Sequence, residues 1–479
     1  MSGPGASADS EPRRSVALNY ALVVTATFLL LVFLQVATGA LQLDRMRVGG
    51  IDPVDLFAYL PSLFFDGDVS FENEYRHLSP GFLKAGNWPR TVTDHVGNCH
   101  NIGMAIAQSP FYAATYLAVA IRKRSFPVPQ QFKYMPAFEY SWYIGNIFWS
   151  AVAAFLLAWW LRKDCGVQRP IHVAVFFVLA TPLLYYAFPL SPMSHPVSLA
   201  AVLLMLLSLG KGKRTGKARW LLAAGLALGF AVSVHILNAV YIVFIGAYCL
   251  IEHIQRRKKD SLSCPKPTTA VVWRNLSLVS MGALVGYLPQ MIVNSVIYGT
   301  CILNPYDPGN LTGHFRIGFS RLLTLLEVAF SMKHGFISWH PILGLGLAGL
   351  IFSAIVKREH FMLALSGLVP VCATWAIVSC SVNWWVGWSF GHRVFISVYP
   401  FLALGIAVLV DSLLERRRRW KTAVVWSLAC LFTLWNVLFA VQYKLGMIPR
   451  GEAITFREYF WQKLLLIGSL VSGGNGLRF

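Results

Sequence analysis

Six carboxylates lie close together between positions 49 and 75, in the sequence GGIDPVDLFAYLPSLFFDGDVSFENEY. The chain has only 21 Asp and Glu residues in total, so its acid is concentrated in this one stretch. Carboxylates gathered at one place are suited to general-base chemistry or to binding a cation. The stretch is therefore the first place to look for function, and its carboxylates are Asp52, Asp55, Asp66, Asp68, Glu72 and Glu74.

Asp52 and Asp55 are the strongest candidates of the six. They begin a segment, VDLFAYLPSLFF, in which apolar residues recur at helical spacing. We expect an amphipathic helix that lies on a membrane surface and holds both carboxylates at its N-terminus, where the helix dipole alone also favours them. The other four are predicted to be turn or surface residues, with Glu72 and Glu74 retained as candidate acceptor or metal contacts.

Cationic and aromatic side chains recur where later apolar segments begin. The stretches SPMSHP, FSMKHGFISWHP and WWVGWSFGHR each carry His, Lys or Arg beside Trp, Pro or Gly. Several cations that converge from separate loops are what a phosphate or pyrophosphate ligand needs. Tryptophans there are able to stack on a sugar or an isoprenoid, although they also form the ordinary aromatic belt of a membrane interface. The predicted phosphate-binding residues are Lys333, His334, Arg393 and His195.

The composition is that of a polytopic membrane protein. Hydrophobic residues make up 56% of the chain and charged residues 13%, about half the charged share of a soluble domain. The net charge of +20 therefore says less about nucleic acid than about which loops hold Lys and Arg. The eight cysteines show no CxxC pair and no metal-ligand spacing. We assign no metal ligand and expect no cofactor, although six clustered carboxylates permit a divalent metal ion.

Eleven apolar segments come near the roughly 20 residues that a helix needs to cross a bilayer. They are Ala17–Leu43, Phe138–Leu161, Pro170–Ala187, Ser194–Leu209, Trp220–Val234, Leu237–Ile251, Val271–Ile292, Phe336–Val356, Phe361–Cys380, Val394–Leu409 and Thr422–Tyr443. One further segment, Ile102–Ile121, is of similar length and apolar character. It contains Gln108 and Pro110, so a further criterion is needed to decide whether it crosses the membrane.

The distribution of Lys and Arg provides that criterion, because cytoplasmic loops collect basic residues. If Ile102–Ile121 does not span, the stretches RKDCGVQR, GKGKRTGKAR, QRRKKD, VKRE and ERRRRWK all fall on one side. If it spans, every later loop changes sides. We therefore predict that this segment is a surface-lying amphipathic helix, with the N-terminus of the chain inside and the C-terminus outside. The segment FREYFWQKLLLIGSL is expected to rest on the outer surface, with a twelfth, tilted span as the alternative.

The predicted organisation has three parts. A cytoplasmic disordered tail at 1–16 precedes an all-α transmembrane domain at 17–415, whose first outer loop covers 44–137. A last span and an outer amphipathic tail follow at 416–479. The acidic stretch and the longer loops then face outward, while short basic connections face inward.

Six stretches together resemble the bacterial members of the multi-span GT-C glycosyltransferases, akin to protein O-mannosyltransferases and aminoarabinose transferases. The resemblance covers roughly Ala17 to Glu415 and rests on the order and spacing of the stretches. It implies a GT-C fold, a first outer loop with two surface helices, an acidic catalytic residue early in that loop and a polyprenyl-phosphate sugar as donor. The stretches are DPVDLFAYLPSLFFDGDVSFENEY, NCHNIGMAIAQSPFY, TPLLYYAFPLSPMSHP, GYLPQMIVNSVIYG, FSMKHGFISWHPILGLGLAGL and WWVGWSFGHRVF.

The resulting hypothesis is sugar transfer, with inversion, at the outer face of a bacterial inner membrane. Asp52 or Asp55 would take the proton of an acceptor hydroxyl on a glycan, lipid or protein. The related proteins leave the choice open, because Asp52 better fits their distance to the aromatic positions and Asp55 fits the shorter spacing to Tyr59. The predicted cations would bind the donor phosphate, and many relatives have Arg where this chain has His235. Residues expected to contact the acceptor or the sugar are Glu74, His100 and Trp385.

Two other classes of function stay open at this point. A lipid or glycan flippase needs a continuous polar path, and few polar residues lie in the middle of the predicted spans. A polymerase or ligase of lipid-linked oligosaccharides would use the outer cations but not the early Asp. Nucleic acid is not an expected partner of either class.

Overall fold

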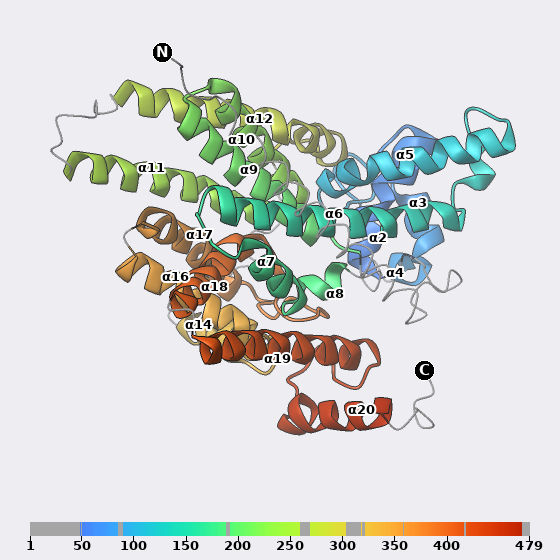
Figure 1. Cartoon of the computed structure of the whole chain (residues 1–479). Coiled ribbons are helices and arrows are strands. Elements are labelled where there is room, and N and C mark those ends of the chain that lie inside the picture. Colours follow the sequence, from blue (N-terminus) through green and yellow to red (C-terminus); the bar gives the residue numbers. More distant parts are fainter. Residues whose placement is uncertain are drawn as a thin grey trace, which may run out of the picture.

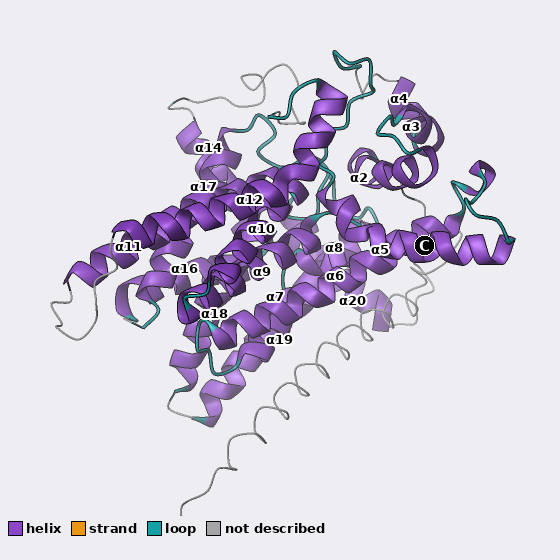
Figure 2. Ribbon diagram, turned by 90° about the horizontal axis from the view of Figure 1, so that it is seen from above, coloured by secondary structure: helices purple, strands orange, loops and turns teal. Residues whose placement is uncertain are grey.

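The structure is a computed structural model, and it describes residues 48, 50–84, 90–187, 192–258, 269–302, 318, 321–357, 359–415 and 418–471. In these residues the chain is helical, with an isolated β-bridge between Arg90 and Val96. Long helices run side by side, and α2 to α5 gather at one end of the molecule in both views (Figures 1 and 2). The predicted tail at 1–16 and the predicted first span Ala17–Leu43 lie outside the described residues.

The described helices follow one another along the chain, joined by connections that range from short turns to longer loops. They are α2 (Ile51–Pro61), η2 (Ser62–Asp66), α3 (Glu72–Leu78), α4 (Pro80–Lys84), α5 (Gly103–Lys123), η3 (Gln130–Phe132), α6 (Pro136–Lys163), α7 (Pro170–Leu179), α8 (Leu183–Ala187), α9 (His195–Thr215), α10 (Ala218–Val234), η4 (Ile236–Ala239), α11 (Val240–Lys258), α12 (Thr269–Tyr298), α14 (Arg321–Phe330), α15 (Phe336–Trp339), α16 (Pro341–Val356), α17 (Phe361–Cys380), η5 (Arg393–Val398), α18 (Tyr399–Leu414), α19 (Arg419–Lys444), η6 (Arg457–Trp461) and α20 (Gln462–Val471).

Eight helices in the described part of the chain are long and apolar enough to cross a membrane. The chain is therefore an integral, multi-pass membrane protein, as its composition predicts. The count of eleven spans stays a prediction, because several apolar helices are shorter and the first predicted span is not described. By length and composition alone α5 also qualifies as a span, so its predicted place on the membrane surface stays a prediction as well.

Three predicted spans are interrupted rather than continuous. Segment 170–187 forms α7 and α8, segment 336–356 forms α15 and α16, and segment 394–409 begins with the short helix η5 before α18. Proline restrains the backbone before it, which explains a break at these places. The amide of Asn436 on α19 donates to the carbonyl oxygens of Leu179 and Thr181 at 2.8 and 2.9 Å, so the first break leaves these groups satisfied. The prolines at the breaks are Pro182, Pro341 and Pro400.

Helix α2 confirms the helix predicted after the first aspartates, but its surroundings differ from the expectation. All side chains from Val54 to Pro61 are buried inside the protein, so the helix does not lie half exposed on its apolar stripe. The Phe57 ring meets the ring of Trp142 on α6 edge-on, with 5.6 Å between centroids, and that of Tyr112 on α5 at 6.1 Å. Protein packing therefore fixes the position of α2.

Glycines bring α10 and α12 into direct contact. A Cβ atom on Gly225 would lie 2.1 Å from the carbonyl oxygen of Val279, and one on Gly229 would lie 2.0 Å from that of Ala283. Small residues four apart allow helix backbones to approach this closely in a membrane. At the end of α10, a Cβ atom on Gly103 would lie 2.4 Å from the backbone of Ser233. These close backbone contacts therefore fix the position of α10 against α12 and of the loop before α5 against the end of α10.

Candidate active site

Asp52 and Arg393 form an ion pair that joins the start of α2 to the start of η5. The Nη2 atom of Arg393 donates to Oδ2 of Asp52 at 2.6 Å, although the residues are 341 positions apart in the chain. The Asp52 side chain is 31% exposed and that of Arg393 is 17% exposed, so a ligand is able to reach both. Burial raises the pKa of Asp52, but the charges of Arg393 and His100 and the Arg393 hydrogen bond outweigh it, so the pKa lies below its ordinary value.

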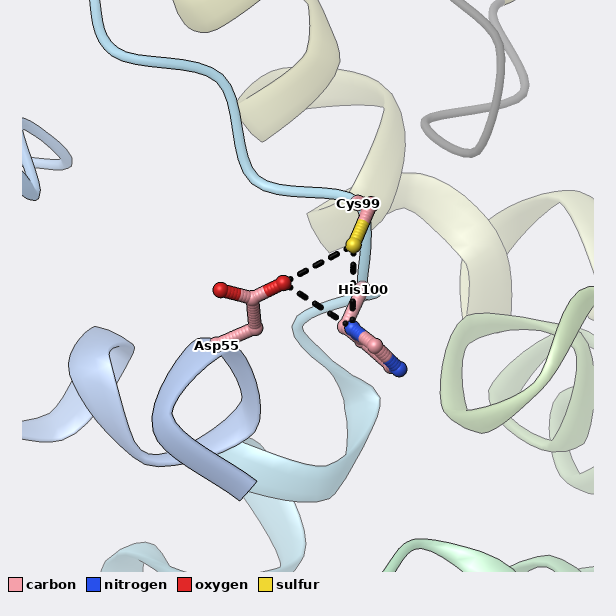
Figure 3. A group of neighbouring side chains, drawn as sticks. All are labelled: Asp55, Cys99 and His100. Carbon is pink, nitrogen blue, oxygen red and sulfur yellow. Dashed lines mark hydrogen bonds and ion pairs between the residues drawn. The ribbon is translucent and has the colours of Figure 1, made fainter. Parts of the chain in front are cut away.

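Asp55, three residues further along α2, is fully buried, in contrast to the partly exposed Asp52. Its Oδ2 atom accepts a hydrogen bond from Sγ of Cys99 at 2.8 Å and lies 3.2 Å from Nδ1 of His100 (Figure 3). Burial lowers the pKa of His100, but the hydrogen bond to Asp55 and the charges of Asp52 and Asp55 outweigh it and raise the pKa. Asp55 therefore orients the His100 ring and favours its protonated form.

A buried hydrogen-bond network fixes the positions of Asp55 and His100 relative to each other. The side-chain amide of Asn98 donates to the carbonyl oxygen of Asp55 at 2.9 Å, and its side-chain oxygen accepts from the backbone N–H of His100 at 2.8 Å. The Tyr59 hydroxyl donates to the carbonyl oxygen of His100 at 2.8 Å. From α12, the Tyr298 hydroxyl donates to the carbonyl oxygen of Asn98 at 2.6 Å. Because every contact is specific, the loop that carries His100 is positioned rigidly.

Asp55, Cys99 and His100 are also the three described residues whose donor atoms come within reach of one ion. Their carboxylate oxygen, sulfur and Nδ1 atoms all lie within 4.8 Å of one another. A mixed set of oxygen, sulfur and nitrogen suits Zn²⁺ better than Mg²⁺ or Ca²⁺. Burial and the Asp55 charge raise the pKa of the Cys99 thiol, so it would have to lose a proton to bind a metal. Sequence analysis missed Cys99, although a Cys directly before a His was an available signal.

Two further histidines border the Asp52–Arg393 pair. His195 begins α9, is buried, and has its ring 5.7 Å from the ring of His235 and 5.2 Å from that of Tyr186. Its Nε2 atom has no hydrogen-bond partner among the described residues. Burial, with the charges of His100 and Arg393, lowers the pKa of His235 to about 4, so this ring is neutral at pH 7. The structure thus brings His195 and His100 to one place, as predicted residues of one site.

Lys333, His334 and Trp385 form a second group close to Arg393. His334 Nδ1 donates to the carbonyl oxygen of Trp385 at 2.8 Å, and Nζ of Lys333 lies 3.8 Å from the centroid of the Trp385 ring. Burial lowers the pKa of His334 to about 4, and the charges of Arg393 and Lys333 contribute to the shift. At pH 7 His334 therefore holds the Trp385 loop as a neutral ring.

Glu74 is set apart from these groups. Its buried carboxylate pairs with Lys133, which also pairs with Asp66 at the end of η2. Burial raises the pKa of Glu74 to about 7, against the opposing charge of Lys133. The turn predicted around Asp66 is confirmed, because Gly67 has a φ of 73° there. Glu74 is thus part of an ion cluster that joins η2, α3 and the segment around Lys133, whereas Glu72 pairs with Arg76 and Arg90 at the surface.

Comparisons with known proteins identify the fold. No family model and no curated protein matches the chain. Among solved structures it is similar to the apo oligosaccharyltransferase of Archaeoglobus fulgidus, with a TM-score of 0.50 and 12% identity over 89% of this chain and 56% of that one. It is also similar to ArnT from Cupriavidus metallidurans bound to undecaprenyl phosphate, with a TM-score of 0.48 and 14% identity over 96% of this chain and 73% of that one.

This likeness bears on the fold rather than on the reaction. The chain spans little more than half of the length of the archaeal oligosaccharyltransferase. At 12% identity the similarity shows a shared fold, and that fold is the GT-C fold. The expectation from the sequence resemblance is therefore confirmed at the level of fold.

Proposed function

We propose that the protein is a membrane glycosyltransferase that moves a sugar from a polyprenyl-phosphate donor to an acceptor hydroxyl, with Asp52 as general base. The observation that carries the proposal is the 2.6 Å contact between Oδ2 of Asp52 and Nη2 of Arg393. This contact supports the proposal because a carboxylate able to act as a base and a cation able to bind a phosphate lie side by side, and the proposed reaction needs both. The fold shared with an oligosaccharyltransferase supports this class of enzyme.

The environments of the two aspartates favour Asp52 over Asp55 as the base. A base must lie within hydrogen-bond reach of the acceptor hydroxyl, and Asp52 is 31% exposed. Asp55 is fully buried, and its Oδ2 already faces Cys99 and His100. We therefore assign Asp55 the role of orienting His100, whose charged ring is suited to donate to an oxygen of the acceptor or of the sugar.

In the proposed reaction the acceptor oxygen attacks the anomeric carbon while Asp52 takes its proton. The bond between the anomeric carbon and the phosphate oxygen breaks, and the lipid phosphate leaves with the electron pair. Arg393 stabilises the negative charge that develops on this leaving group, with Lys333 as a second cation in the neighbourhood. A single displacement inverts the anomeric centre. We place the site at the outer face of a bacterial inner membrane, because the basic loops of the chain are expected on the inner face.

A second candidate is a ligase or polymerase that uses a lipid-pyrophosphate oligosaccharide, because the fold is shared with an oligosaccharyltransferase. Arg393 and Lys333 would bind a pyrophosphate equally well. The two candidates are separated by offering the purified protein a polyprenyl-phosphate sugar and a polyprenyl-pyrophosphate oligosaccharide in parallel. We expect turnover with the first donor, and turnover with the second alone would favour the ligase.

The base is tested with Asp52→Asn and Asp55→Asn in the full-length protein in lipid nanodiscs. We expect Asp52→Asn to lower the rate of sugar transfer by about 10²–10⁴-fold, the usual worth of a general base. Asp55→Asn should reduce the rate less, because the base itself stays in place. The matched control is Asp94→Asn, an 86% exposed acid of the same outer loop at a positive φ that Asn tolerates. Wild-type turnover in Asp52→Asn would exclude this residue as the base.

A further inference from the structure

The Asp52–Arg393 contact engages the two groups that the proposed reaction uses. The oxygen that would take the acceptor proton is Oδ2, and it is the atom that Arg393 holds at 2.6 Å. Both side chains remain partly exposed, so the pair is open to a ligand rather than sealed in the core. A base bound to a cation is a weak base, and a cation bound to a carboxylate is a weak phosphate site.

We propose, resting on the function proposed above, that this ion pair is a latch that the donor phosphate opens, so that Asp52 becomes a competent base only when the donor is bound. A phosphate is an equally good partner for the planar guanidinium and can bind it through two oxygens. When the phosphate takes over Arg393, the carboxylate loses its strongest hydrogen bond and is free to face the acceptor. The donor therefore binds before the acceptor is activated.

The charges around Asp52 explain how the base strength changes. The positively charged groups that act on it are Arg393 and His100, with the larger influence from Arg393, whereas the neighbouring His235 is neutral at pH 7. Burial acts in the opposite direction and raises the pKa of Asp52. A bound phosphate neutralises Arg393 but leaves the burial unchanged, so the pKa of Asp52 rises. His100 stays in place, and its charge limits how far the pKa of Asp52 rises.

The latch also gives a route for product release. After transfer, Asp52 carries the acceptor proton and Arg393 holds the lipid phosphate. Once the proton passes to water, the carboxylate is charged again and competes with the lipid phosphate for the guanidinium. Closing of the ion pair therefore favours departure of the spent lipid carrier.

Binding of a polyprenyl phosphate without a sugar tests the latch, because this lipid cannot react. We expect Asp52→Asn to bind it more tightly than the wild type, by about three- to tenfold, since removing a competing partly exposed ion pair is worth about 1 kcal/mol. Asp94→Asn should bind it as the wild type does, and Arg393→Gln should bind it more weakly. Equal or weaker binding by Asp52→Asn would overturn the latch. No binding to the wild type would instead overturn the proposed function itself.

The pH dependence of the rate gives a second, independent readout. The profile of kcat/KM for the donor reports the base in the free enzyme, whereas that of kcat reports it with the donor bound. We expect the acidic limb of the kcat profile to lie at higher pH than that of kcat/KM. Coincident acidic limbs would show that donor binding leaves Asp52 unchanged and would contradict the latch.

Discussion

At the scale of single residues, two aspartates three positions apart have opposite surroundings. Asp52 is partly exposed and meets Arg393, whereas Asp55 is buried against Cys99 and His100. The sequence predicted that both belong to the site but could not separate their roles. The deciding partner of Asp52 lies 341 positions away, and no local pattern encodes a contact at that distance. Cys99 was not predicted as a site residue, because the eight cysteines show no CxxC pair and no metal-ligand spacing.

The Asp55–His100 pair makes stability depend on pH. The pKa of folded His100 lies above its ordinary value of 6.5, because the hydrogen bond to Asp55 and the nearby charges outweigh burial. A raised folded pKa stabilises the fold fully below the unfolded pKa, and this stabilisation is lost as pH rises through the folded pKa. We therefore expect the difference in melting temperature between wild type and His100→Gln to be largest below pH about 6.5 and to shrink at higher pH.

Thermal unfolding in detergent between about pH 5 and about pH 9 measures this difference over the window that brackets the ordinary histidine pKa. Asp55→Asn serves as the matched variant, because it removes the same interaction from the other side and should abolish the same pH dependence. A difference that grows with rising pH would contradict the assignment of His100 as the charged partner.

At the scale of helices, the sequence predicted long apolar elements well and their interruptions poorly. The predicted span Thr422–Tyr443 corresponds to α19 at Arg419–Lys444, because a continuous apolar run permits little else in a membrane. The break between α7 and α8 was not predicted, although Pro182 marks it. Its free carbonyl groups are satisfied by Asn436, a partner from a distant helix that periodicity does not show.

The close contact between α10 and α12 predicts the effect of replacing a glycine there. Gly229→Ala places a Cβ atom 2.0 Å from the carbonyl oxygen of Ala283, so the two helices must separate. We expect a loss of stability of about 1–3 kcal/mol, as for other overpacked sites, and reduced transfer activity because His235 directly follows α10. Thermal unfolding and the transfer assay measure the two effects.

Gly246→Ala on α11 is the control for helix propensity, because no atom lies within 4 Å of a Cβ atom there. Alanine in a helix interior is more favourable than glycine by about 0.5–1 kcal/mol, so this variant should be slightly more stable than the wild type. If Gly229→Ala and Gly246→Ala raised stability equally, Gly229 would not be needed for the close contact between α10 and α12.

At the scale of the whole molecule, the class of protein and its fold were predictable, while the convergence of the site was not. A 56% hydrophobic composition and the order of six motifs predicted a membrane protein with a GT-C fold. The structure adds that α2, the loop before α5 and η5 meet at one place. That meeting also bears on the side of the membrane to which each loop belongs.

The contact between Asp52 and Arg393 constrains the membrane position of α5. Two residues in contact lie on the same side of the membrane. Eight predicted spans separate Arg124, at the end of α5, from Arg393, and an even number of crossings returns the chain to its starting side. With that predicted count, Arg124 would lie on the side of Asp52, and α5, which lies between Asp52 and Arg124, would not cross. The contact thus agrees with the basic loops in favouring a surface position for α5.

Reporter fusions test this placement directly. We expect a fusion after Arg124 to report the outer side and a fusion after Lys163, at the end of α6, to report the inner side. If α5 crosses, both reporters exchange sides, and Asp52 and Arg393 could remain in contact only with an odd number of spans between Arg124 and Arg393. Because the two fusions flank one helix, their opposite readings control for each other. A cytoplasmic reporter after Arg124 would therefore overturn the predicted topology.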